Sequence, residues 1–78
     1  MNRKLCLESE MRKAIEEKKS FLISVTIPGC NKPEIIINPW ENLEYKLEYY
    51  KKAYTDNLEL VHNNEIKIID FGIIIRNH

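Results

Sequence analysis

The stretch FLISVTIPGCNKPEIII, residues 21–37, decides the fold that we expect for this chain. Residues 21–27 alternate in hydropathy, which predicts a strand whose buried face carries Phe21, Ile23, Val25 and Ile27. Residues 28–33 contain two prolines, a glycine and an asparagine, and this composition predicts a turn. Residues 34–37, EIII, predict a second strand. We therefore expect an antiparallel hairpin with a long connection.

A helix start follows the hairpin in the sequence NPWE, residues 38–41. Asn38 suits the N-cap, Pro39 suits the first helical position, and Glu41 can complete a capping box. Replacing Asn38 with alanine is therefore expected to cost about 1 kcal/mol of stability. The helix should run to about residue 58, with a core face made of Trp40, Leu43, Leu47, Tyr50, Tyr54 and Leu58.

Two outer segments complete the expected fold. Residues 7–18 show a narrow apolar stripe at helical spacing, and residues 65–75 predict a third strand in which Gly72 marks a bulge. The order α-β-β-α-β predicts an α+β class: a single small domain over residues 1–78, with helices packed on a three-stranded, mainly antiparallel sheet. We expect the strand order 2-1-3; the alternative, 1-2-3, needs a right-handed crossover.

Composition and charge narrow the range of functions. Twelve basic and twelve acidic residues cancel in a chain of 78, which argues against a general nucleic-acid binder because such proteins need a basic surface. The N-terminus is polar and apolar runs are short, so we expect neither a signal peptide nor a membrane span. The expected location is the cytoplasm.

Residues with the potential for metal binding or nucleophilic catalysis are few and scattered. Cys6, Cys30, His62 and His78 show none of the paired spacings typical of metal sites. Two cysteines are also too few for a disulfide framework, so we expect reduced thiols. The sequence thus predicts no catalytic residue, no metal site and no cofactor.

Two tyrosines on the second helix point to a binding surface. Tyr45 and Tyr49 fall one turn apart on the side opposite the core face. Tyrosine brings rigid contact area and a polar tip, so we expect both rings to anchor a partner. The polar surround should consist of Asn42, Lys52 and Asp56. The alternative is that a neighbouring segment covers these rings, or that they are exposed without a role.

The predicted third strand is apolar on both faces, with Ile69, Phe71, Ile73 and Ile75 on one and Ile66, Ile68 and Ile74 on the other. A sheet with helices on a single face would leave one of these faces exposed to water. Either the helix expected at residues 7–18 or a second subunit would have to cover it. We expect a second subunit, which predicts a homo-oligomer.

The run IPGCNKPEIIINPWENLEYKLEYYKKAYTDNLEL, residues 27–60, followed by EIKIIDFGI, residues 65–73, resembles a group of small phage and prophage proteins of low-GC Gram-positive bacteria. The likeness spans roughly residues 23–73, and IINPWENLEYK and YYKKAY are its most distinctive parts. The group has no established activity, so the resemblance transfers no catalytic residue. It implies an accessory role, such as inhibition of a host defence factor.

These observations predict a non-enzymatic binding protein. The partner is expected to be a host protein that the chain occupies, or a small ligand that it sequesters. The alternative is a nucleic-acid-associated protein in which Tyr45 and Tyr49 stack on bases and Lys46, Lys51 and Lys52 contact phosphates.

Overall fold

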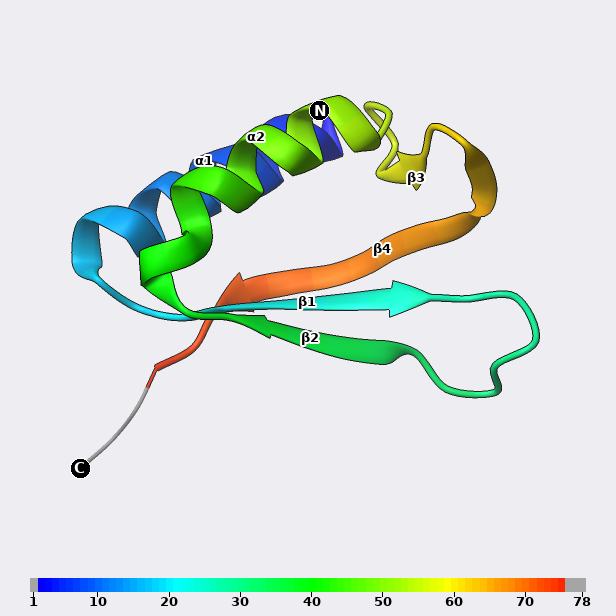
Figure 1. Cartoon of the computed structure of the whole chain (residues 1–78), viewed down its shortest axis with the longest axis horizontal. Helices are drawn as coiled ribbons and strands as arrows, with labels where there is room; N and C mark the ends of the chain where they lie inside the picture. Colours follow the sequence, from blue (N-terminus) through cyan, green and yellow to red (C-terminus); the bar gives the residue numbers. More distant parts are fainter. Residues whose placement is uncertain (1, 76–78) are drawn as a thin grey trace.

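The computed structural model describes residues 2–75. These residues form two helices that lie side by side on one face of a four-stranded sheet (Figure 1). In chain order the elements are α1 (Arg3–Glu17), β1 (Phe21–Thr26), β2 (Glu34–Asn38), the 3-10 turn η1 (Trp40–Asn42), α2 (Leu43–Ala53), β3 (Glu59–Leu60) and β4 (Asn63–Ile73). The sheet order is β2-β1-β4-β3, and all neighbouring strands are antiparallel.

The α+β class is confirmed, but the three-stranded sheet is wrong. The three predicted strands keep the order 2-1-3, since β1 lies between β2 and β4. The additional strand, β3, forms because α2 ends at Ala53 rather than near residue 58. Tyr54 is extended and Leu58 has a positive φ of 61°, so the chain turns back and pairs with the start of β4.

The core lies between the sheet and the two helices. The predicted stripe of α1 is buried at Leu7, Met11 and Ala14, and the predicted face of β1 is buried at Phe21, Ile23 and Val25. Ile15 and Ile27 are only partly buried. The face of α2 is buried at Leu43, Leu47 and Tyr50. The prediction is wrong for Trp40, which is 36% exposed because it lies in η1, ahead of the regular helix. The Lys18 ammonium lies 5.7 Å from the centre of the indole ring of Trp40.

Asn38 is not the N-cap of the helix, and this prediction is wrong. It is the last residue of β2 and is only 3% exposed, while Pro39 precedes η1 and Asn42 precedes α2. Neither of these two positions provides a side-chain cap. The Nδ2 atom of Asn38 makes no well-formed hydrogen bond within residues 2–75. Loss of a cap is therefore no reason for Asn38→Ala to destabilise the chain.

A bulge in β4 explains why that strand is apolar at both odd and even positions. Ser24 pairs with Asp70 and Val25 pairs with Ile68, so Ile69 is an extra residue in the ladder. The bulge brings Ile68, which is fully buried, to the same sheet face as Phe71 and Ile73. Gly72 pairs regularly with Leu22, so the predicted bulge position is wrong. The two-faced pattern of β4 therefore no longer supports a second subunit.

Local contacts fix α1 beside α2. Asn2 begins α1, because its Oδ1 atom accepts hydrogen bonds from the backbone nitrogens of Lys4 and Leu5 at 2.8 and 3.3 Å. The helix therefore starts at Arg3 rather than at residue 7.

A contact between side chain and backbone joins the two helices. The Lys4 ammonium donates a hydrogen bond of 2.5 Å to the carbonyl of Lys51, near the end of α2. Neither helix within residues 2–75 has the length and apolar character needed to cross a bilayer.

Candidate binding site

The outer face of α2 carries two exposed tyrosines at the edge of a shallow hollow. Tyr45 is 76% exposed and Tyr49 is 48% exposed. The hollow, of about 210 Å³, is lined by Tyr45, Glu48, Tyr49 and Lys52. These positions are spaced i, i+3, i+4 and i+7, so a single helix brings them together without help from another element.

Tyr49 is held in place by a buried tyrosine beneath it. Its ring packs edge-on against Tyr50 with 5.3 Å between the ring centres, and Tyr50 contacts Tyr54 at 5.6 Å. The ammonium of Lys46 lies 5.7 Å from the ring centre of Tyr49. Tyr49 is thus an exposed side chain supported by the core, which lowers the conformational entropy that a partner would have to remove.

Charges of both signs surround the two rings. Glu48 forms an ion pair with Lys51 at 3.7 Å. Lys52 is exposed and takes part in no ion pair within residues 2–75. The hollow therefore presents two aromatic rings, a partly neutralised carboxylate and one available cation.

The structure brings together three of the five predicted binding residues. Tyr45, Tyr49 and Lys52 line the hollow, whereas Asn42 and Asp56 do not. Asn42 is exposed at the end of η1. The predicted position of Asp56 on the helix face is wrong, because α2 ends at Ala53. It lies in the following turn, where its carbonyl accepts a hydrogen bond from the backbone nitrogen of Lys4 at 3.3 Å.

Glu48 is the lining residue that the sequence analysis missed. Its position three residues after Tyr45 and four before Lys52 places it on the same helix face. The helical spacing alone could have identified it.

The buried tyrosines below this face keep their protons at neutral pH. Burial raises the pKa of Tyr54 to about 12, with smaller contributions from Tyr49 and Tyr50. Burial also raises the pKa of Tyr50, against a smaller lowering by the Asn38 amide. Both hydroxyls therefore stay neutral near pH 7, and neither supplies a base.

A second hollow of about 290 Å³ lies between the start of α1 and β4, lined by Arg3, Cys6, Asp70 and Phe71. Its charged side chains are engaged by the backbone. The Arg3 guanidinium donates to the carbonyl of Ile69 at 3.2 Å, and the Asp70 carboxylate accepts from the backbone nitrogen of Phe71 at 2.9 Å. The Arg3 contact fastens α1 to β4 and the Asp70 contact lies within β4, so we assign this hollow a structural role.

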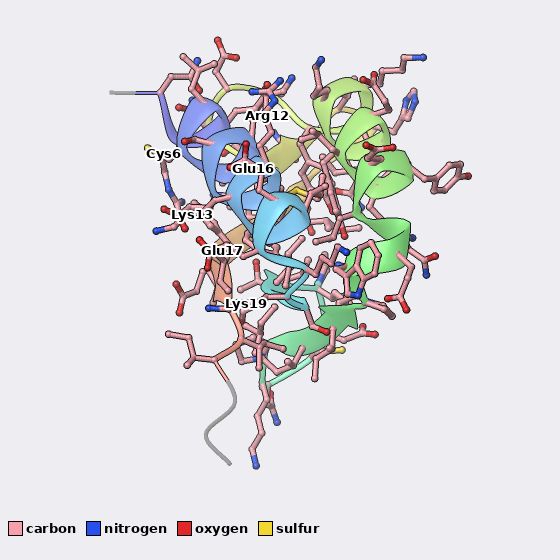
Figure 2. All side chains as sticks on the ribbon, turned by 90° about the vertical axis from the view of Figure 1, so that its left-hand side faces the viewer. Cys6, Arg12, Lys13, Glu16, Glu17 and Lys19 are labelled. Atoms are coloured by element: carbon pink, nitrogen blue, oxygen red, sulfur yellow. The ribbon has the colours of Figure 1, made fainter. Side chains whose placement is uncertain are left out.

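The outward side of α1 differs from that of α2. Figure 2 shows charged side chains of both signs along α1, among them Arg12, Lys13, Glu16 and Glu17. Leu5, 61% exposed, is the large apolar side chain exposed on this helix. A mixed charged surface of this kind is typical of a solvated helix face, and it leaves α2 as the helix with exposed aromatic area.

The potential metal ligands lie apart within the described residues. Cys30 is exposed in the turn between β1 and β2, and His62 is exposed in the turn between β3 and β4. Cys6 lies on α1, and His78 lies outside the described residues. Within residues 2–75 no three side chains of His, Cys, Asp or Glu gather as a metal site would require.

Comparisons with protein-family models, with curated proteins and with solved structures return no match for this chain.

Proposed function

We propose that this chain is a non-enzymatic binding protein that holds a partner protein on the outer face of α2. The observation that carries the proposal is the exposed pair Tyr45 and Tyr49, with Tyr49 supported by the buried ring of Tyr50. Interface centres are rich in tyrosine because one rigid ring supplies apolar area and a hydrogen-bonding hydroxyl. Lys52 would pair with an acidic group of the partner.

The size of the hollow favours a protein over a small ligand. Pockets for small molecules usually enclose about 300–1,000 Å³. The hollow beside Tyr45 holds about 210 Å³ and is open to solvent along the helix. Such a shape suits a partner that projects its own side chains between the two rings.

The setting that we propose follows from the resemblance to small phage proteins. In that setting the chain acts in the host cytoplasm and occupies a host protein, such as a component of an antiviral defence system. Sequestration of a small ligand is the other form of this proposal. Both forms require binding without chemical conversion of the partner.

The test is affinity purification from a low-GC Gram-positive host lysate with three forms of the chain. The wild type and a Leu5→Ala control, which changes an exposed side chain on α1, should retain the same host protein. The Tyr45→Ala/Tyr49→Ala variant should lose it, since truncating central aromatic anchors typically costs about 2 kcal/mol or more each. Equal retention by all three forms would contradict the proposal.

A nucleic-acid partner is the second candidate, favoured by the position of Lys46 over the ring of Tyr49. Stacked bases and neighbouring lysines are a common arrangement for single-stranded nucleic acids. The charge of the segment speaks against it, because Glu41, Glu44 and Glu48 balance Lys46, Lys51 and Lys52. Binding to a single-stranded oligonucleotide that falls steeply as salt rises would favour this candidate. Absence of binding at low salt would eliminate it.

A further inference from the structure

The outer edge of β2 presents backbone groups that point away from the sheet. The backbone nitrogen of Ile74 donates to the carbonyl of Ser20 at 2.9 Å. Backbone groups of successive residues in a strand point to opposite neighbours, so this bond shows which residues of β1 face β4 and which face β2. Even-numbered residues of β1 therefore bond to β4, and odd-numbered residues bond to β2. The partners of these odd-numbered residues are Glu34, Ile36 and Asn38. The N–H and C=O groups of Ile35 and Ile37 consequently face outward.

The opposite edge of the sheet is protected, in contrast to β2. Its outer strand, β3, has only two residues. Beyond β3, the backbone nitrogen of Phe71 donates to the side chain of Asp70, and the carbonyl of Ile69 accepts from Arg3. Short strands and engaged edge groups are the usual means by which proteins prevent edge pairing. Within β2 there is no proline, lysine or bulge, and Ile35 and Ile37 are 54% and 59% exposed.

We propose that two copies of this chain pair through β2, edge to edge and antiparallel, with a two-fold axis beside Ile36. In this register Ile35 of each copy lies opposite Ile37 of the other, and the outward N–H and C=O groups of both residues form hydrogen bonds. The isoleucine side chains then meet on the sheet face that the helices leave uncovered. The result is one continuous sheet that runs through both copies.

The charges at the ends of β2 favour this antiparallel arrangement. The two-fold axis places Lys32, just before β2, near Glu41 of the second copy, just after its β2. Both residues are exposed, and within residues 2–75 neither forms an ion pair. Glu34 then lies opposite Asn38, whereas a parallel arrangement would place Glu34 beside Glu34 and Lys32 beside Lys32. Like charges placed directly opposite destabilise strand pairing.

The prolines that flank β2 limit the pairing to this short segment. Pro33 and Pro39 have no N–H group to extend the ladder, so the contact closes after the bonds of Ile35 and Ile37. The surface area that such an edge contact buries is smaller than the roughly 800 Å² per partner that a stable complex buries. We therefore expect reversible dimerisation at micromolar concentrations or above. A two-fold edge contact also stops at two copies instead of growing into a filament.

The experiment measures the mass of the full chain by sedimentation equilibrium over about 10–500 µM, a range that spans the expected dissociation constant. The wild type should pass from monomer to dimer. Ile35→Pro removes one outward N–H that β1 does not use, so the variant should fold and stay monomeric. Ile35→Val, which keeps the backbone donor and a β-branched side chain, should dimerise as the wild type does.

Amide hydrogen exchange identifies the edge itself. The amides of Ile35 and Ile37 should become protected as the concentration rises, while the amide of Ile36, bonded to β1, should be protected throughout. A wild type that stays monomeric over the whole range overturns the proposal. A dimer that survives Ile35→Pro but is lost in Leu22→Lys would show that the open sheet faces pack together, and would also overturn it. The Tyr45→Ala/Tyr49→Ala variant should still dimerise, so this test stands apart from the proposed function.

Discussion

Four tyrosines lie between residues 45 and 54, and their environments differ sharply. Tyr45 and Tyr49 are exposed, while Tyr50 and Tyr54 are 4% and 6% exposed. The ring contacts run from Tyr49 through Tyr50 to Tyr54, so the exposed ring of Tyr49 forms one cluster with the two buried rings. Because exposure differs between these neighbours, we predict a role in binding for Tyr45 and Tyr49 and a role in folding for Tyr50 and Tyr54.

Alanine substitutions should separate these roles. Tyr50→Ala and Tyr54→Ala each remove a buried aromatic ring, and we expect each to cost roughly 3 kcal/mol or more. Tyr45→Ala/Tyr49→Ala should change stability much less, because Tyr45 is mostly exposed and Tyr49 is about half exposed. Urea unfolding of the three variants measures the difference. Unfolding of the double variant would mean that the Tyr49–Tyr50 contact holds the core together and would contradict separate roles.

The buried hydroxyl of Tyr54 makes stability depend on alkaline pH. An unfolded tyrosine loses its proton near pH 10, whereas the pKa of Tyr54 in the folded chain is about 12. Between these values the unfolded state binds fewer protons, so stability is full below pH 10 and falls as the pH rises toward 12. We expect deprotonation of Tyr54 to lower the free energy of unfolding by about 2–3 kcal/mol between pH 10 and pH 12.

Urea unfolding at pH 9, 10 and 11 checks this dependence. Tyr54→Phe removes the titrating hydroxyl and should flatten the pH profile relative to the wild type. A remaining slope would come from Tyr50, whose pKa is also raised by burial. Identical slopes for the wild type and Tyr54→Phe would show that this hydroxyl does not control the alkaline loss.

At the level of elements, two residues other than glycine within residues 2–75 adopt left-handed backbone conformations at chain reversals. Lys18 ends α1 with φ of 55°, and Leu58 lies in the turn before β3 with φ of 61°. Lys18 is exposed, while Leu58 is fully buried. The backbone strain is similar at the two positions, but only Leu58 offsets it by filling the core.

Glycine substitutions at these two positions should therefore have opposite effects. Lys18→Gly should stabilise the chain by about 0.5–1 kcal/mol, because glycine adopts the left-handed conformation at a helix end without steric cost. Leu58→Gly should destabilise it by more than about 2 kcal/mol, because a buried side chain is lost. Thermal unfolding of both variants tests the pair. A destabilised Lys18→Gly variant would show that the lysine contact with Trp40 outweighs the backbone strain.

Alternation and helical spacing predicted the parts of the fold that the core determines. The inner face of β1, the stripe of α1 and the exposure of Tyr45 follow from periodicity alone. The wrong predictions concern residues whose conformation depends on strand pairing between segments distant in the sequence. Asn38 joins β2 because it pairs with Phe21, and Asp56 leaves the helix because β3 pairs with β4. Of the candidate site, the two rings and Lys52 were predictable, since they depend only on helix geometry.

On the scale of the whole molecule, both helices cover the same face of the sheet, as Figure 1 shows. The other face has no second layer within residues 2–75, and Ile35 and Ile37 remain exposed there. The apolar surface that suggests self-association thus lies on β2 rather than on β4. The expectation of a homo-oligomer remains a prediction, but it now rests on a different strand.

Dimerisation through β2 would make thermal stability depend on concentration. Association that occurs only in the folded state raises the melting temperature by mass action. We expect the melting temperature of the wild type to rise between about 10 and 500 µM, and that of Ile35→Pro to stay constant. Differential scanning calorimetry at several concentrations measures this. A wild-type melting temperature that does not change would contradict dimerisation through this edge.

The extra residue at Ile69 has a consequence for how the length of this chain can vary. Without Ile69, Ile68 and Asp70 would become neighbours, opposite Val25 and Ser24, the residues that they already face. Deleting Ile69 would therefore leave the same side chains inside and outside, and the shortened chain should still fold. Deleting Gly72 instead would shift the end of the strand by one residue and turn Ile73 away from the core. The bulge is thus a position where the gene could lose one codon without changing which residues are buried.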